Sequence, residues 1–140
     1  MTTQTHLGYA EAKRAIDAVI AAMQSEGLAA TVAVADAHGE LIALARADGA
    51  TLGSILIAQN KAWTAARERQ PSRDVGQAAR HPESGFDVAY FGDPRYIGWG
   101  GGLPVVIGGK VVGAVGVSGV PEETDMRLAQ IGVQAIIQRL

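Results

Sequence analysis

The strongest constraint on the fold lies in the last third of the chain, where two apolar runs flank a pair of glycines. The runs are residues 103–107 and 110–118, and Gly108-Gly109 separates them. A two-residue Gly-Gly link favours a type I′ turn, because both central positions of that turn need a positive φ. The sequence therefore predicts a tight β-hairpin here, with two neighbouring antiparallel strands.

A second hairpin is predicted nearer the N-terminus. Residues 31–35 and 41–45 are short apolar runs, and the segment Asp36-Ala37-His38-Gly39 lies between them. Asp and Gly are common turn residues, Asp through its side-chain hydrogen bonds and Gly through its access to positive φ. We therefore expect two hairpins, separated by about 60 residues of other structure.

Three longer segments carry helical patterns. Residues 9–26 repeat apolar side chains at helical spacing, and Gly27 is expected to end that helix. A second helix is expected from about residue 51 to residue 69, with Thr51 or Asp48 as its cap. A third begins at Pro121, followed by acidic residues that suit a helix N-terminus, and runs to the end of the chain.

The second predicted helix has two different faces. Its expected core-facing stripe consists of Leu52, Ile55, Leu56, Gln59, Ala62, Trp63 and Ala66. The opposite face carries Ser54, Ala58, Lys61 and Ala65, so a lysine stands among small residues at i, i+3, i+4 and i+7 spacing. A face of this kind suits close contact with another surface.

Residues 71–102 show no sustained periodicity. Residues 75–80 and 86–91 each predict a short helix or an irregular turn. The segment holds most of the aromatic residues: Phe86, Tyr90, Phe91, Tyr96 and Trp99. Such a concentration indicates either the wall of a pocket for a flat conjugated ligand, or a satellite core or oligomer contact that pins a long loop.

The order helix, hairpin, helix, irregular segment, hairpin, helix predicts one α/β (α+β) domain over residues 1–140. Its simplest packing is an antiparallel sheet of about five strands with helices on its faces.

A formal charge of −2, with scattered basic residues, argues against nucleic acid as a partner. No apolar run approaches a membrane span, and the absence of cysteine excludes disulfides and thiolate chemistry. We expect a cytoplasmic protein.

Four blocks of the sequence resemble one known family. They read VADAHGEL at 34–41, RADGA at 46–50, KAWTA at 61–65, and GGLPV with GKVVGAVGVSG at 101–105 and 109–119. In this order they resemble the GlcG/HbpS-like family, the so-called haem-degrading family, and also the C-terminal domain of PduO-type proteins. The resemblance covers nearly the whole chain. It implies a profilin-like sandwich that assembles into dimers or higher homo-oligomers. It also implies haem or another tetrapyrrole as a possible cofactor, or a role in aromatic catabolism.

Several polar residues are candidates for a site. Arg46 and Lys61 are suited to holding a carboxylate or a propionate. The alternatives are that Arg46 pairs with Asp48 or Asp36, and that Lys61 is solvated or lies at a subunit boundary. Glu123 and Asp125 begin the last helix, where either is a candidate general base, although acids are common there for structural reasons.

The histidines bear on the haem interpretation, because without cysteine an axial ligand must be His, Tyr or Met. The chain offers His6, His38 and His81, of which we take His38 and His81 as candidate ligands. Their spacing matches no zinc motif, and no metal site is predicted.

Two functional hypotheses follow. In the first, the protein binds haem, with Phe91, Tyr96 and Trp99 around the macrocycle. In the second, it is a cofactor-independent enzyme, a hydrolase, deaminase or isomerase, acting on an unsaturated carboxylate from aromatic catabolism. Arg46 or Arg95 would then anchor the carboxylate, Lys61 or Glu123 would move protons, and Trp99 would cover the site. A structural oligomer without a ligand is the third alternative.

Overall fold

Two β-hairpins join edge to edge into one four-stranded antiparallel sheet. The computed structural model describes residues 1–140. The sheet order is β2-β1-β4-β3, so the first strand of one hairpin pairs with the second strand of the other. The elements in chain order are α1 (Tyr9–Glu26), β1 (Thr31–Asp36), β2 (Leu41–Arg46), α2 (Gly53–Glu68), α3 (Ser72–Ala79), the 3-10 helix η1 (Val88–Phe91), β3 (Gly102–Ile107), β4 (Lys110–Ser118) and α4 (Glu122–Ile137).

The predicted α+β class and both hairpins are confirmed, but the strand count is four rather than about five. The reason is that the two hairpins supply every strand. The long segment between them forms α3, η1 and loops, and it joins the sheet only at Gly102, where β3 begins.

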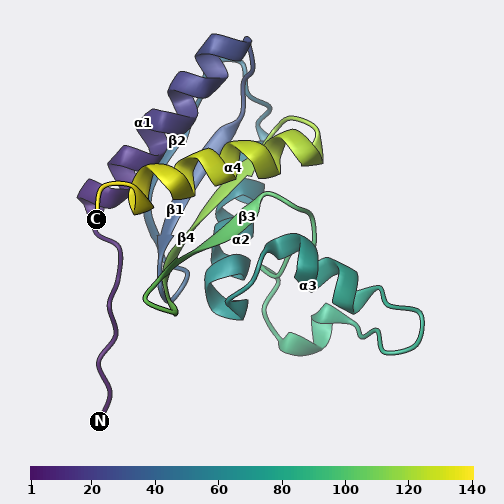
Figure 1. Ribbon diagram of the computed structural model, residues 1–140. Helices are drawn as coiled ribbons and strands as arrows, with labels where there is room; N and C mark the ends of the chain where they lie inside the picture. The colour runs from purple at the N-terminus through teal and green to yellow at the C-terminus, as the bar shows by residue number, and fades with distance from the viewer.

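The sheet lies between two helical layers, with α1 and α4 on one face and α2 on the other (Figure 1). The alternation of β1 explains the two layers, because successive side chains of a strand point to opposite faces. Val32 and Val34 belong to the core under α1 and α4. Ala33 and Ala35 belong to the core under α2. The bulky core therefore lies on the α1/α4 side.

The α2 helix packs unusually close to the sheet. A methyl group on Gly116 of β4 would collide with the carbonyl oxygen of Ala58, and one on Gly102 of β3 would collide with the carbonyl oxygen of Lys61. Small side chains on both surfaces thus let the helix backbone approach the strands.

The predicted core stripe of α2 is partly wrong. Its small-residue face, including Ser54, Ala58 and Lys61, is the face buried against the sheet. Leu52 and Leu56 instead point outward, with 75% and 62% of their surface exposed. The sheet surface beneath α2 is built from glycine and alanine, and it accepts only the small face of the helix.

Local signals placed most element ends correctly. Gly27 ends α1 with a φ of 66°, and Gly108 and Gly109 both have positive φ, as a type I′ turn requires. The start of α2 differs, since neither Thr51 nor Asp48 caps it and the helix begins at Gly53. The α4 helix ends at Ile137, before the end of the chain.

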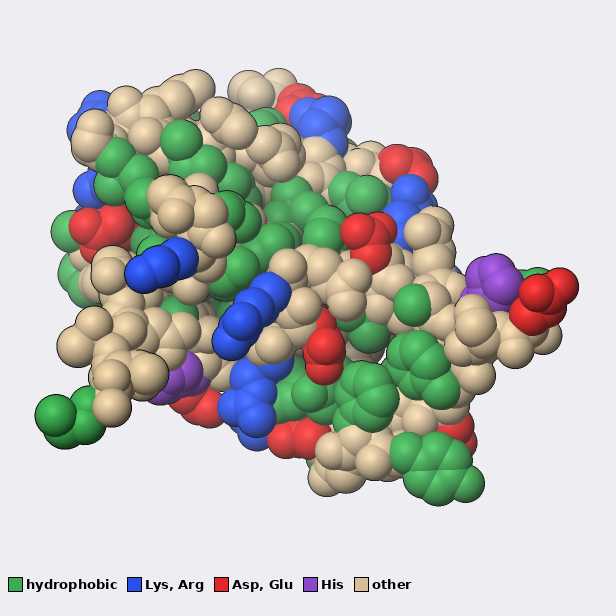
Figure 2. Space-filling view, turned by 60° about the horizontal axis from the view of Figure 1, so that its bottom comes forward, with side chains coloured by type: hydrophobic (Ala, Val, Ile, Leu, Met, Phe, Trp, Pro, Cys, Tyr) green, Lys and Arg blue, Asp and Glu red, His purple; other side chains and the backbone are tan.

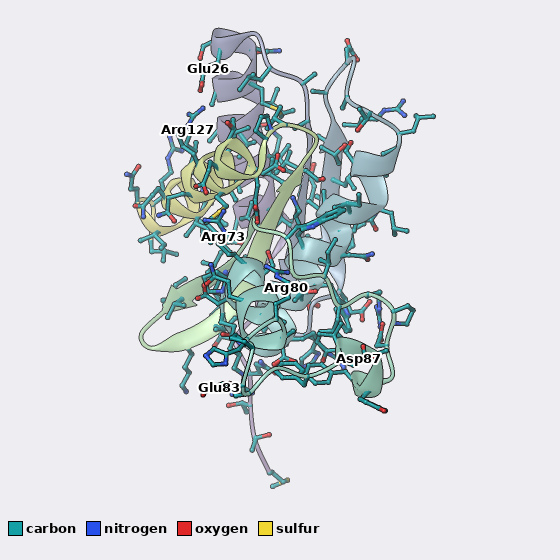
Figure 3. All side chains as sticks on the ribbon, turned by 90° about the vertical axis from the view of Figure 1, so that its right-hand side faces the viewer. Glu26, Arg73, Arg80, Glu83, Asp87 and Arg127 are labelled. Carbon is teal, nitrogen blue, oxygen red and sulfur yellow. The ribbon has the colours of Figure 1, made fainter.

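An ion pair ties the two helices of the α1/α4 layer together. The guanidinium of Arg127 donates to both carboxylate oxygens of Glu26, at 3.0 and 2.6 Å (Figure 3). Neither this layer nor α2 supplies a membrane span, because no helix has both the length and the hydropathy that crossing a bilayer needs.

Candidate functional site

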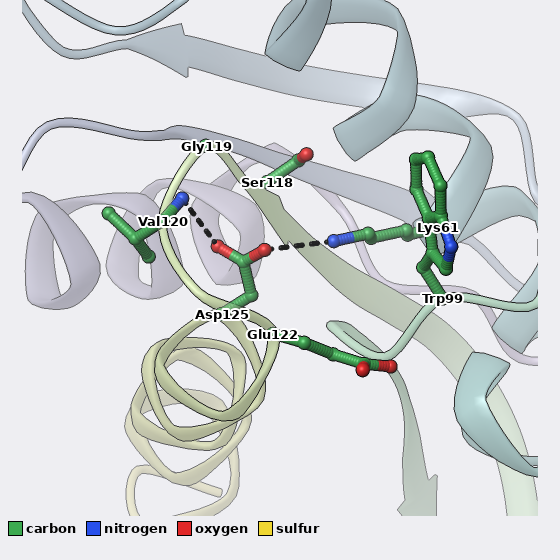
Figure 4. Close-up of a pocket in the computed structure, with 7 residues that line it drawn as sticks. All are labelled: Lys61, Trp99, Ser118, Gly119, Val120, Glu122 and Asp125. Carbon is green, nitrogen blue, oxygen red and sulfur yellow. Dashed lines mark hydrogen bonds and ion pairs between the residues drawn. The ribbon is translucent and has the colours of Figure 1, made fainter.

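A pocket of about 350 Å³ opens where β4 ends and α4 begins. Residues from three places in the sequence line it: α2, the glycine-rich loop before β3, and the β4–α4 junction (Figure 4). They are Lys61, Trp99, Ser118, Gly119, Val120, Glu122 and Asp125. Two of the predicted site residues, Lys61 and Trp99, therefore lie together.

The floor of this pocket is a buried ion pair. Lys61 and Asp125 are 2% and 3% exposed, and the Lys61 ammonium lies 3.0 Å from Asp125 Oδ2. Lys61 also donates to the carbonyl oxygen of Val117 at 2.9 Å, and Asp125 Oδ1 accepts the Val120 N–H at 3.2 Å. These bonds satisfy both charges, as a buried pair requires. Lys61 is thus not solvated.

Burial raises the pKa of the Asp125 carboxyl, while Lys61 and the backbone N–H groups of Val120 and Gly119 oppose that rise. A carboxyl whose charged form is disfavoured by desolvation keeps its proton to higher pH than an exposed aspartate. Perturbed carboxyls of this kind, when they border a pocket, are candidates for proton transfer. The Lys61–Asp125 pair is therefore the chemically most distinctive feature of this pocket.

The glycine-rich loop before β3 lies against the Lys61–Asp125 pair. Gly101 has a φ of 128°, and a methyl group there would lie 2.9 Å from the Lys61 ammonium. Ser72 holds the loop, since its hydroxyl donates to the Trp99 carbonyl at 2.6 Å and accepts the Gly102 N–H at 2.9 Å. The exposed Trp99 ring stands beside Lys61 (Figure 4). The loop thus serves as a wall of the site as well as a turn.

The two glutamates at the start of α4 have other partners. Glu122 accepts the Gly100 N–H and lies 3.3 Å from the Arg73 guanidinium. These hydrogen bonds, the one from Gly100 first, lower the pKa of Glu122. The exposed Glu123 carboxylate pairs with Arg73 at 2.6 Å and does not line the pocket. Of the acids considered in this helix, Asp125 is the one that meets Lys61.

A second group of predicted residues surrounds Trp63 on α2. The Tyr96 ring meets Trp63 edge-on at 4.7 Å, and Phe91 meets Tyr96 at 4.8 Å. The guanidiniums of Arg95 and Arg67 lie 4.3 and 5.0 Å from the Trp63 ring. We call this group, together with the exposed side chains of Leu41 and Leu56 beside it, the Trp63 surface.

The Trp63 surface contains a small pocket of about 120 Å³ that both Leu41 and Leu56 line. Gly39 also lines it, and the main chain of the neighbouring His38 lies close by, because Arg67 donates to the His38 carbonyl oxygen at 3.5 Å. The His38 imidazole packs against the His6 ring instead, with its Nε2 atom 2.7 Å from the Gln4 side-chain oxygen. The structure therefore brings the side chains of Arg95, Tyr96 and Phe91 and the main chain of His38 to one region.

The remaining candidates lie elsewhere. His81 accepts the N–H groups of Glu83 and Ser84, both at 3.1 Å, in the loop after α3. In Figure 2, histidine side chains accordingly appear at two widely separated places. Arg46 is exposed at the end of β2, opposite Thr31, and lines neither pocket.

The sequence itself carries signals for two residues of these sites, Asp125 and Trp63. Asp125 lies three and four positions before the buried Leu128 and Ala129, so helical spacing places it on the inner face of α4. Trp63 belongs to the predicted core stripe of α2, and its ring is buried, but the ring also makes a T-shaped contact with Tyr96 and lies beneath the guanidiniums of Arg67 and Arg95.

The sequence matches a protein-family model described as "Haem degrading protein HbpS-like" over residues 7–134. The chain belongs to the HbpS-like family. The predicted resemblance is thereby confirmed, and both the Lys61–Asp125 pocket and the Trp63 surface lie within the part of the chain that this HbpS-like match covers.

Individual relatives agree with this assignment. Protein GlcG of Escherichia coli strain K12 is 37% identical over 105 residues, which cover 72% of this chain and 75% of GlcG. The crystal structure of Klebsiella pneumoniae protein ORFY superposes with a TM-score of 0.92 at 30% identity and covers 100% of this chain and 96% of ORFY. A crystal structure of a PduOC:heme complex has a TM-score of 0.86 at 26% identity, covering 94% of this chain and 96% of PduOC.

Proposed function

We propose that this HbpS-like protein binds haem or a related tetrapyrrole at the Trp63 surface. The observation that carries the proposal is the convergence there of two arginines and an aromatic group, which are Arg67, Arg95 and the Trp63–Tyr96–Phe91 chain, with the main chain of His38 beside them. The haem complex of the similar PduOC protein adds support from outside this chain.

The residues present fit each part of a haem group. Leu41, Leu56 and the aromatic chain offer apolar area to the macrocycle. Arg67 and Arg95 offer guanidiniums to the propionates, and Arg67 is the freer of the two, because Arg95 already pairs with Asp93 at 2.9 Å. The His38 imidazole, which packs against His6, would turn toward this surface to ligate the iron. When bound, haem would supply the redox chemistry of its iron.

The small volume of this pocket bears on assembly. A space of about 120 Å³ cannot enclose a macrocycle, so haem would lie against the surface with one side uncovered. Leu52 and Leu56 are exposed on the same outer face of α2. Together with Leu41 and the aromatic chain they would add to an exposed apolar area, and contiguous areas of that kind favour association. A homo-oligomer in which a second copy covers the outer side of haem is therefore part of the proposal.

Haem titration of the untagged apoprotein tests this function. We expect a stoichiometric Soret shift in visible spectra that is lost in His38→Ala, because the axial ligand is removed. Arg67→Ala should keep the shift but bind more weakly, because a propionate partner is lost. The matched control is His81→Ala, which should titrate like the parent protein. A non-saturating change, or one that His38→Ala leaves intact, would contradict the proposal.

The Lys61–Asp125 pocket favours the second candidate, a cofactor-independent acid–base enzyme on an unsaturated carboxylate. Its carrying observation is a buried ammonium beside a carboxyl of raised pKa at the floor of an open pocket. Lys61 would attract the substrate carboxylate, Asp125 would move the proton, and Trp99 would flank the carbon chain. Glu123 is assigned no step, because it faces Arg73 outside the pocket.

Tryptophan fluorescence distinguishes this candidate. With cis,cis-muconate as the probe, we expect a saturable change in emission as the dicarboxylate enters beside Trp99. The Trp99→Phe variant should lose that change, since its one remaining indole, Trp63, is a buried residue of α2 outside the pocket. An equal change in Trp99→Phe, or none in the parent protein, would count against the pocket as a carboxylate site.

A further inference from the structure

The N-terminal segment crosses the β1–β2 turn and places two histidines beside an aspartate. His6 comes from the extended segment before α1, and Asp36 and His38 come from the end of β1 and the turn that follows. We propose that these three residues form a binding site for a divalent transition-metal ion such as Zn²⁺, which shares only His38 with the proposed haem site and no residue with the Lys61–Asp125 pocket.

The distances suit this assignment. One donor atom from each residue lies within 4.8 Å of the other two, and His6 Nδ1 is 4.0 Å from Asp36 Oδ2. In a tetrahedral zinc site with bonds of about 2.0–2.2 Å, neighbouring ligand atoms are about 3.3–3.6 Å apart. Small side-chain rotations at this partly exposed position would close the difference. Two imidazoles and one carboxylate, with a further position for water, are a common zinc donor set.

The turn already holds the carboxylate in place. Asp36 Oδ1 accepts the N–H groups of His38 and Glu40, at 2.8 and 3.1 Å. The other oxygen, Oδ2, is the one that lies toward His6. The turn hydrogen bonds therefore fix the carboxylate through one oxygen, and the second oxygen faces His6. Such an arrangement preorganises the carboxylate for binding an ion.

The two imidazoles are also held near each other. The His6 and His38 rings meet edge to face, with centroids 4.6 Å apart and an interplanar angle of 83°. The Ala37 N–H reaches His6 Nδ1 at 3.1 Å, and the Gln4 side-chain oxygen lies 2.7 Å from His38 Nε2. An ion would replace these contacts with coordination bonds, and Gln4 is positioned as an additional oxygen donor or an outer partner.

The spacing of the three histidines in the sequence indicates no metal site, and His6 is also 30 positions away from Asp36. In the folded chain these residues lie close together. A bound ion would cross-link the N-terminal segment to the β1–β2 turn, next to the main-chain bond from Leu7 N–H to the Val112 carbonyl. Since His38 also serves the proposed haem site, metal titrations should use haem-free protein.

Isothermal titration of the untagged apoprotein with Zn²⁺ tests the site. We expect one saturable site per chain. The variants His6→Gln and Asp36→Asn should each weaken it by at least about tenfold, since each loses a ligand. Asp36→Asn keeps an oxygen for the turn hydrogen bonds, so its loss of affinity reports the charge rather than a broken turn. Circular dichroism should show both variants folded.

The histidine outside the cluster supplies the control. His81→Gln should bind Zn²⁺ as the parent protein does, because His81 lies in the loop after α3. Non-saturating Zn²⁺ uptake, or uptake that His6→Gln and Asp36→Asn leave unchanged, would overturn the proposal. The haem proposal is judged separately, since its readout is the Soret band.

Discussion

Replacing Lys61 by methionine is expected to lower the free energy of unfolding by about 3–5 kcal/mol, because the change leaves Asp125 as a buried carboxylate without its cation. Both residues are almost fully buried, so the carboxylate that remains has little contact with water to replace the lost ammonium. Methionine keeps the length of the side chain and its apolar contacts against the sheet. Urea denaturation followed by circular dichroism measures the difference.

A double variant and a pH series separate loss of the charge from loss of packing. Lys61→Met with Asp125→Leu should recover much of the stability, since no unpaired charge remains. In the single Lys61→Met variant, Asp125 loses the ammonium that opposed the rise of its pKa. A folded-state pKa above the ordinary value of 3.8 means that stability falls as the pH rises from 3.8 through the folded pKa. The single variant should therefore be less destabilised in mildly acidic than in neutral solution, and a defect independent of pH would contradict the charge argument.

Gly116→Ala is expected to destabilise the protein by about 1–3 kcal/mol or more, because its methyl group would collide with the main chain of α2. The nearest atoms are the Ala58 carbonyl oxygen and the Ala62 nitrogen, and neither can rotate away as a side chain would. The α2 helix must shift from the sheet, and this shift would also move Lys61. Thermal unfolding detects the loss as a lower Tm.

Gly53→Ala is the matched control for this prediction. Gly53 begins the same helix, has ordinary negative φ, and has no atom near the position of an added methyl group. Alanine there should leave the stability unchanged or raise it slightly, by about 0.4–1 kcal/mol, because alanine has less conformational freedom than glycine in the unfolded chain. If both variants had the same Tm, close packing of α2 on β4 would be refuted.

Local sequence signals were sufficient for most of the secondary structure. The Gly108-Gly109 turn, the end of α1 at Gly27 and the first hairpin depend on the conformations of a few adjacent residues. The same is true of β1, in which valine and alanine alternate. This alternation gives one face of the sheet bulky core side chains and lets a helix approach closely on the other face. Such features need no knowledge of distant partners.

The orientation of α2 depended on a distant surface. Hydrophobicity alone favours burying Leu52 and Leu56, and that inference was wrong. The sheet below the helix presents Ala33, Ala114 and Gly116, which leave no room for leucine. Which face of α2 is buried therefore depends on the fit between the helix and the sheet, and not on the hydrophobic pattern of the helix alone.

The candidate sites were likewise decided by tertiary structure. The sequence by itself determined the α+β class, the hairpin turns, the family blocks and most of the residue types that a site would use. Only the folded chain paired Lys61 with Asp125, 64 positions away, and brought His6 to Asp36. The physical reason is that turns and helix ends follow from short-range backbone preferences, whereas ion pairs and ligand clusters depend on which distant segments the packing of the core brings into contact.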